Sequence, residues 1–133
     1  MDGIQIREVV DSGDARGSSF PLDIPSGQFS LKHMHVTTLL PGHTRGNHFH
    51  IVRNELLVIV YEDNWALYWD AAEGAPVQRQ SFVGKGCVLV TVPPHASHAI
   101  VNEGNLAVHI LGLADHRYDP SAPDTFSRVL TPG

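Results

Sequence analysis

Short apolar runs separated by turn-forming residues recur along most of this chain. They are rich in β-branched and aromatic residues and recur about every 8–12 residues, a spacing typical of β-sandwiches and β-barrels. No segment combines helical periodicity with capping residues. The sequence therefore predicts an all-β fold. Its 133 residues suit one domain, which can bury about two-thirds of the surface that the unfolded chain exposes.

The expected domain, residues 1–133, has a core at about residues 28–115. Residues 1–27 are expected to form an edge strand around Ile4 and Ile6 and then a loop rich in Gly, Pro and Ser, which Phe20 and Leu22 could anchor to the barrel or to a partner subunit. Residues 116–133 are an expected extended tail on the outside. The strands expected in the core cover residues 28–40, 56–61, 65–69, 77–83, 87–92, 95–102 and 106–113.

Composition excludes several classes of protein. The formal net charge is -5 and no basic patch is visible, so nucleic-acid binding is not expected. The longest clean apolar run, residues 56–61, is too short to span a membrane, and no signal peptide is visible at the N-terminus. The single cysteine, Cys87, allows no intrachain disulfide. We expect a cytoplasmic protein, and the low charged fraction of 17% favours a homodimer.

Two histidines and a glutamate stand close together after the Pro41-Gly42 turn signal. In a β-strand, residues i and i+2 point to the same side about 6.5–7 Å apart, so His48 and His50 can share a target while Phe49 points away. Glu55 follows five residues after His50. Imidazole and carboxylate together suit a divalent metal ion such as Zn, Fe, Mn or Ni.

A second motif lies in the other half of the chain. Gly86 begins an apolar strand, Pro93 ends it, His98 follows five residues later and Asn102 four residues after that. If the two motifs meet in space, His48, His50, Glu55 and His98 could hold one divalent metal ion per chain and leave positions open for water or substrate. If only the histidines bind the metal, Glu55 could act as an outer partner or as an acid/base group.

Together the two motifs resemble those of the cupins, which form a double-stranded β-helix, or jelly-roll barrel. The first cupin motif, G-x5-H-x-H-x3–4-E-x6-G, is matched except that Glu62 stands at the closing glycine. The second, G-x5-P-x-G-x2-H-x3-N, is matched with one extra residue before Pro93 and with His95 in place of the internal glycine. The resemblance spans residues 42–102.

A narrower resemblance comes from residues 43–50, from Arg53-Asn54-Glu55 and from the tail 118–126. These segments are similar to the C-terminal cupin domain of bifunctional capsular-polysaccharide reductase/epimerases, which act on nucleotide-linked keto-deoxy sugars. The resemblance implies a zinc-binding cupin that epimerises or isomerises a nucleotide-linked sugar beside its keto group. The reductase domain of those proteins has no counterpart in this chain.

Further residues could complete such a site. Arg45 could bind a phosphate or carboxylate of the substrate, although loop arginines are commonly just solvated. His43 and His95 could act as acid/base groups at a pocket rim, or be plain turn histidines. Asn102 could contact substrate or only orient its turn, and Tyr61 could stack on a sugar or belong to the core.

Two questions stay open at this stage. His33 and His35 share one face of the expected strand 28–40, and they could line either the barrel or a subunit interface. His48 could be a metal ligand or, as in the dTDP-sugar 3,5-epimerases with their similar Arg-Gly-x-His run, the base of a metal-free sugar epimerase or isomerase. A metal-dependent oxygenase and a non-catalytic, ligand-binding or sensory cupin are further alternatives.

Overall fold

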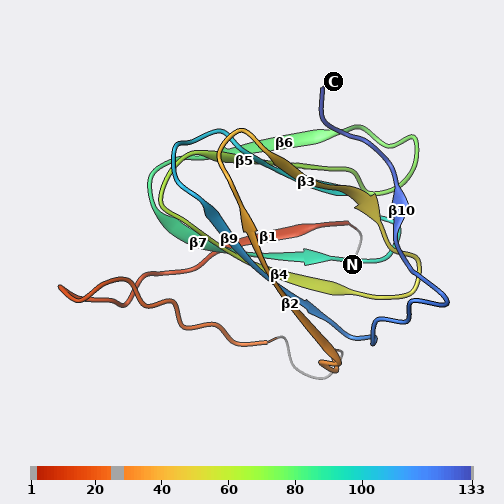
Figure 1. The fold of residues 1–133 in the computed structure, drawn as a ribbon, viewed down its shortest axis with the longest axis horizontal. Helices are drawn as coiled ribbons and strands as arrows, with labels where there is room; N and C mark the ends of the chain where they lie inside the picture. Colours follow the sequence, from red (N-terminus) through yellow and green to blue (C-terminus); the bar gives the residue numbers. More distant parts are fainter. Residues whose placement is uncertain (1–2, 25–28, 133) are drawn as a thin grey trace.

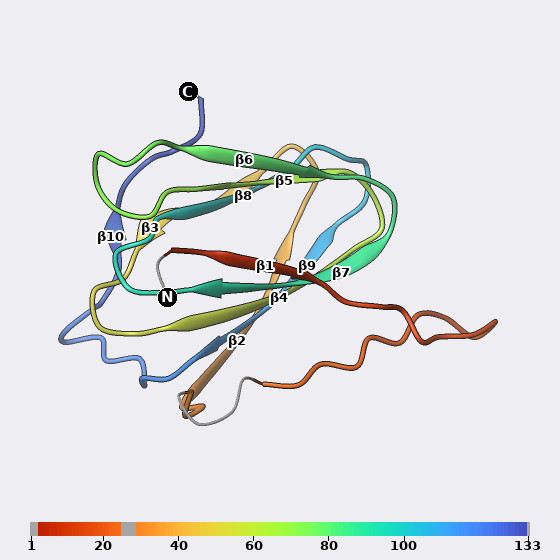
Figure 2. The same ribbon diagram turned by 180° about the vertical axis from the view of Figure 1, so that it is seen from behind.

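The computed structural model describes residues 3–24 and 29–132. In these residues ten strands form two five-stranded antiparallel sheets that face each other (Figures 1 and 2), with the strand orders β1-β7-β4-β9-β2 and β10-β3-β8-β5-β6. This architecture confirms the predicted all-β cupin fold. The strands are β1 Gln5–Glu8, β2 His33–Leu39, β3 Thr44–Phe49, β4 Glu55–Tyr61, β5 Trp65–Trp69, β6 Gln78–Phe82, β7 Gly86–Val92, β8 His98–Asn102, β9 Val108–Ala114 and β10 Phe126–Ser127.

Most observed strands match the expected ranges closely, two are shorter, and β10 forms in the segment that was expected to be an extended tail. The strand expected at residues 28–40 begins at His33, because its pairing with β9 starts there; residue 28, like the end of the preceding loop, lies outside the described residues. The strand expected at 95–102 begins at His98. Pro93 and Pro94 supply no backbone N–H for a ladder, and His95 has a positive φ of 74°.

β4 is buried on both faces, which accounts for its unbroken apolar sequence. Leu57, Ile59 and Tyr61 point between the two sheets into the main core. Leu56 lies on the outer face in a second cluster with Leu89 and Leu113. Residues before β2 cover this second cluster, namely Val9, Leu22 and Phe29. Leu22 therefore anchors the N-terminal segment to the outside of the first sheet.

The main core is aromatic at one end of the barrel. The ring of Trp65, which is fully buried, stacks on Phe82 with ring centroids 4.3 Å apart and an interplanar angle of 10°. Tyr61 packs against both rings, with centroid distances of 5.5 and 5.9 Å. Large rings therefore fill this end of the interior, which leaves the opposite end of β4, at Glu55, for polar groups.

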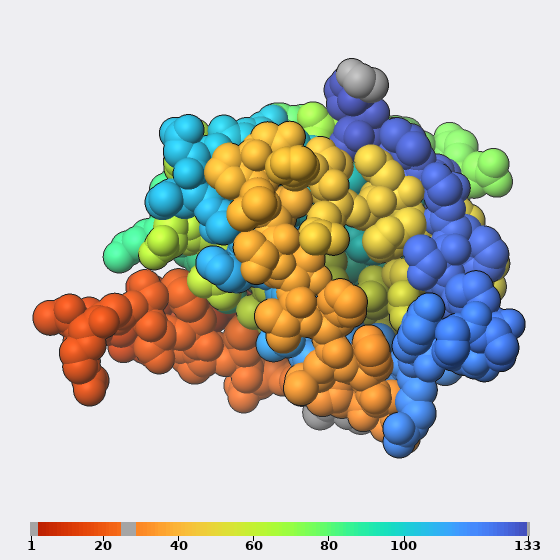
Figure 3. Space-filling view, viewed as in Figure 1, coloured from red at the N-terminus to blue at the C-terminus, as the bar shows by residue number. Residues whose placement is uncertain are grey.

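Two segments lie outside the sheets. Residues 12–19 form a loop that extends away from the barrel (Figures 1 and 2), and the chain then returns so that Leu22 packs against the first sheet. The C-terminal segment runs down one side of the molecule, in blue in Figure 3, and its short strand β10 pairs with Phe49 and His48 at the end of β3. In the described part of the chain, no helix is long and apolar enough to cross a membrane.

Candidate active site

A β-bulge places the first histidine of the site. β3 pairs with β8 through Gly46 opposite Ala99 and His48 opposite His98, so Asn47 is an extra residue in the ladder. Gly46 and Asn47 have positive φ angles of 102° and 57°. A side chain at Gly46 would be impossible without movement, since its Cβ would lie 2.5 Å from the carbonyl oxygen of His98. The Gly46-Asn47 turn signal is thus a bulge that sets the direction of His48.

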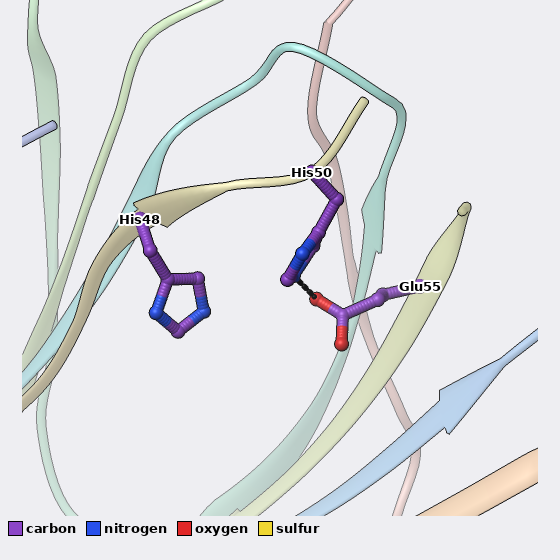
Figure 4. A group of neighbouring side chains, drawn as sticks. All are labelled: His48, His50 and Glu55. Atoms are coloured by element: carbon purple, nitrogen blue, oxygen red, sulfur yellow. Dashed lines mark hydrogen bonds and ion pairs between the residues drawn. The ribbon is translucent and has the colours of Figure 1, made fainter. Parts of the chain in front are cut away.

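The two histidines and Glu55 meet as the i and i+2 spacing predicts. His48 lies near the end of β3, His50 lies just beyond that strand, and Glu55 is the first residue of β4. The three side chains point into the same space (Figure 4). The rings of His48 and His50 have centroids 5.1 Å apart. His50 Nε2 lies 2.8 Å from Glu55 Oε1. One potential ligand atom from each residue lies within 4.8 Å of the others.

His98 joins this group from β8. Its ring is perpendicular to that of His48 with centroids 4.9 Å apart, and its Nε2 lies 3.9 Å from Glu55 Oε1. The side chain is buried, and its Nδ1 has no hydrogen-bond partner among the described residues. The four residues proposed as ligands from the sequence therefore lie together, although His98 stands slightly apart from the compact group of three.

Burial and charge set the protonation of the site. Burial would raise the pKa of the Glu55 carboxyl, but the hydrogen bond with His50 and the surrounding cationic side chains outweigh it and lower this pKa to about 2. Burial lowers the pKa of His98 to about 4. The pKa of His48 is also lowered, chiefly by burial and next by the charge of His50. At neutral pH, Glu55 is therefore ionised, while His48 and His98 are neutral imidazoles.

Asp124 in the C-terminal segment holds the second histidine and the loop after it. The backbone carbonyl of Asp124 accepts a hydrogen bond from His50 Nδ1, which leaves Nε2 to face Glu55. The carboxylate of Asp124 accepts hydrogen bonds from the backbone N–H groups of Ile51, Val52 and Arg53 at 2.8, 3.0 and 3.0 Å. These bonds lower the pKa of Asp124 against the opposing effect of burial.

The rest of the same segment is fixed to the barrel end. The Arg128 guanidinium makes a two-pronged ion pair with the buried carboxylate of Asp70, at 2.8 and 2.7 Å. The amide of Asn47 in the bulge bonds Leu130 and Thr131 at 2.9 and 3.0 Å. The tail was expected only to pack outside, but it supports the site residues. Sequence reasoning missed Asp124 because the contact joins residues 74 positions apart; the only signal was the resemblance of residues 118–126.

A pocket of about 600 Å3 opens over the group. His48, Glu55, His98 and Arg45 line it, as does Arg53, whose guanidinium lies 3.3 Å from the Thr125 hydroxyl. His33 and His35 also line this pocket, which agrees with the barrel alternative; His33 is half-buried and His35 is exposed. The volume lies within the range of about 300–1,000 Å3 that is usual for small-molecule sites.

Four other candidates from the sequence lie outside the pocket lining. His43 and His95 are exposed, and the backbone N–H of His95 donates to the carbonyl of His50 at 2.6 Å. Asn102 is buried, and its side chain bonds backbone groups of Leu39, Leu106 and Gly104, so it orients the turn. Tyr61 belongs to the apolar core.

The donor set fits a divalent metal ion. Two imidazoles and one carboxylate form the ligand set of many catalytic zinc and non-haem iron sites. His50 satisfies the usual requirement for an outer hydrogen bond, because its Nδ1 donates to a backbone carbonyl; a bound metal would replace the hydrogen bond that its Nε2 makes with Glu55. Of the residues proposed as ligands, His48, His50 and Glu55 are thus suited to a divalent ion by chemistry and by placement, and the role of His98 as a ligand stays a prediction.

Comparisons with known proteins agree with this architecture. The family model of the polysaccharide biosynthesis C-terminal domain matches residues 13–126. A comparison with curated protein sequences gives no match. Among solved structures, the capsular polysaccharide assembling protein CapF from Staphylococcus aureus is 24% identical with a TM-score of 0.65, and the alignment covers 92% of this chain and 34% of CapF. This chain thus spans about a third of that protein.

Two smaller structures are matched over most of their length. QdtA, a sugar 3,4-ketoisomerase from Thermoanaerobacterium thermosaccharolyticum in complex with TDP, is 19% identical with a TM-score of 0.69, and 93% of this chain and 87% of QdtA are covered. A dTDP sugar isomerase from Desulfovibrio desulfuricans G20 is 16% identical with a TM-score of 0.75, at 96% and 85% coverage. These likenesses show the fold. Because the family model covers most of its length, the chain belongs to the polysaccharide biosynthesis C-terminal domain family.

Proposed function

We propose that this protein is an isomerase or epimerase that moves a proton at the carbon beside a keto group of a nucleotide-linked sugar. The observation that carries the proposal is His48, a half-buried imidazole that lines the pocket and is kept neutral by its lowered pKa. A neutral imidazole near working pH is suited to take a proton from carbon and to return it. The structural similarity to QdtA and to the dTDP sugar isomerase supports this class of substrate.

The neighbouring residues have distinct roles in such a reaction. His48 Nε2 or Nδ1 takes the proton from the carbon beside the carbonyl, and the resulting imidazolium is stabilised by the ionised Glu55 nearby. The same imidazolium then returns the proton to the other face of the same carbon, which gives epimerisation, or to the former carbonyl carbon. In the second case, the proton of the adjacent hydroxyl passes to the former carbonyl oxygen, which gives isomerisation. His50, which is fixed by Asp124 and Glu55, keeps its orientation throughout. The apolar walls contributed by Leu57, Ile100 and Ile110 limit the access of water.

A metal-dependent form of the same reaction is the second candidate, and the compact donor set of His48, His50 and Glu55 favours it. A bound divalent ion would supply Lewis-acid polarisation of the substrate carbonyl. In that case His48 would be a ligand, and its role as the base would pass to another group at the pocket.

The experiment that tests the proposal measures proton exchange with solvent. The protein, prepared without a histidine tag, is incubated with dTDP- and UDP-linked 4-keto-6-deoxy sugars in deuterium oxide, and NMR follows deuterium at the carbons beside the keto group. Incorporation that is lost in His48→Ala supports the proposal. Absence of exchange with every sugar of the panel contradicts it.

Chelation separates the two candidates. Exchange that survives dialysis against a strong chelator, with no stoichiometric metal found by elemental analysis, identifies His48 as the base. Exchange that disappears on chelation and returns with one added equivalent of metal identifies the metal-dependent form. His50→Ala should then fail to retain the metal.

A further inference from the structure

The pocket extends well beyond the group of His48, His50 and Glu55. In the first sheet, Glu55 on β4 pairs with Ala114 on β9, and Ala114 pairs with His33 on β2. One row further along, Leu57 pairs with Gly112, and Gly112 with His35. Residues of one row point to the same face of a sheet, so the histidines of β2 point into the same pocket as Glu55, which agrees with their place in its lining.

Small residues separate the two groups of polar side chains. Neighbouring strands lie about 4.8 Å apart, so His33 is displaced from Glu55 by two strands, or about 10 Å. The residues between them, Ala114 and Gly112, have almost no side chain, and both line the pocket. They form a shallow floor along which a ligand can reach from the site to β2. A sugar ring with the phosphate on its anomeric carbon has about the length needed.

The pocket is electropositive in an acidic protein. The chain carries a formal net charge of -5, yet Glu55 is the one acidic residue among the described residues that line the pocket, against the two arginines Arg45 and Arg53. Arg53 is close to Glu55 at 3.9 Å. Arg45 instead reaches toward β2, where its Nε donates to the carbonyl of Thr38 at 3.3 Å, three residues along the strand from His35. The positive potential and the donors at the β2 end suit an anionic group.

We propose that His33 and His35 form a subsite that binds the diphosphate of a nucleotide-linked sugar, with Arg45, which contacts β2 farther along, adding positive charge, while the sugar ring lies over Gly112 and Ala114 against His48 and Glu55. This proposal rests on the proposed function, because it divides one substrate between the two ends of one pocket. Tyr118, which is exposed at the rim and lines the pocket, offers a ring face to the nucleoside.

The subsite is tested by binding rather than by turnover. Isothermal titration calorimetry measures the affinity of the full-length protein for dTDP and UDP, with thymidine and inorganic pyrophosphate as the two halves of the ligand. The variants are His33→Ala, His35→Ala, their double variant and Arg45→Ala. Met34→Ala is the matched control, because Met34 lies between the two histidines on the opposite, exposed face of β2.

The double variant is expected to weaken dTDP binding by at least about tenfold, since it removes donors to a charged group, while Met34→Ala stays within about twofold of the parent protein. Pyrophosphate should compete with dTDP and lose affinity in the same variants, whereas thymidine should not. If the double variant has no cooperative melting transition, the conservative His35→Gln, which is close in size but removes the imidazole, replaces it.

Two results would overturn the subsite: parent protein that binds neither nucleoside diphosphate, or binding that the histidine and arginine variants leave unchanged. The proposed function fails in a different way. If dTDP binds through His33 and His35 but no keto sugar exchanges a proton, the subsite stands and the isomerase proposal fails. If a keto sugar exchanges a proton but the variants bind dTDP as tightly as the parent protein does, the isomerase proposal stands and the subsite fails.

Discussion

The two ends of the barrel interior are built from the same strands but are filled differently. Along β4, the residues that point inward run from Glu55 through Leu57 and Ile59 to Tyr61. At the Tyr61 end, stacked aromatic rings leave no room, and at the Glu55 end small residues and histidines leave a pocket of about 600 Å3. The comparison teaches that one end stabilises the fold, so that the other can hold partly unsatisfied polar groups such as His98 Nδ1.

The sharpest test of this division is a substitution at the open end. His48→Ala should reduce proton exchange on the keto sugar by about 10²–10⁴-fold, the usual contribution of a general base, with a melting temperature close to that of the parent protein. His109→Ala is the matched control, since His109 is exposed on β9 and lies outside the pocket lining. Equal loss in both variants would contradict the role of His48.

At the closed end the expected effect is on stability. Trp65→Ala should lower the free energy of unfolding by about 3–5 kcal/mol, because it removes a fully buried ring and leaves a cavity. Trp65→Phe should cost less, since the indole N–H has no partner among the described residues. Denaturant unfolding measures both. A stability loss at Trp65 no larger than at exposed His109 would show that the aromatic stack does not dominate the core.

The two ends should also differ in their response to pH. His98 has a folded pKa of about 4, below its unfolded value near 6.5, so the unfolded chain binds the proton more readily and stability falls as the pH drops from 6.5 toward 4. Glu55, with a folded pKa of about 2, contributes stability that is present above pH 4.5 and lost below it. Each pKa unit corresponds to about 1.4 kcal/mol, so the His98 loss is up to about 3 kcal/mol.

Denaturant unfolding at several pH values measures this dependence. His98→Asn should flatten the change between pH 6.5 and pH 4, whereas Trp65→Phe should shift the whole curve and leave its slope unchanged. A slope that His98→Asn leaves intact would place the responsible group elsewhere.

The smallest expected effect concerns the C-terminal segment, which contacts the open end of the barrel. Asp124→Ala removes the carboxylate that accepts three backbone hydrogen bonds from residues 51–53, so the loop that carries His50 should loosen. Outer hydrogen-bond partners of this kind are worth about 10–100-fold in activity or metal affinity. Activity and metal content are measured together with melting, for which Ser121→Ala at the exposed Asp119 turn is the control. Unchanged activity in Asp124→Ala would show that the segment only covers the barrel.

Much of the site could be predicted because residue spacings within short segments of the sequence indicate it. The i and i+2 spacing brought His48 and His50 together, and the matching of two motifs with the cupin pattern placed His98 beside them. Neither the bulge at Asn47 nor the support from Asp124 could be derived. A bulge depends on how β3 meets β8, and Asp124 meets His50 only after the chain has closed the barrel.

By itself, the sequence determined most of the strands, the all-β class and the grouping of histidines with Glu55, because side-chain alternation and short-range spacing follow directly from strand geometry. The tertiary structure alone decided which candidates face the pocket. It placed His33 and His35 in the pocket lining and Met34 on the opposite face of β2, put Tyr61 in the aromatic core, and used Asn102 to hold a turn. The physical reason is that register and sheet packing fix which face of a strand is the inside, and both arise from contacts between residues far apart in the chain.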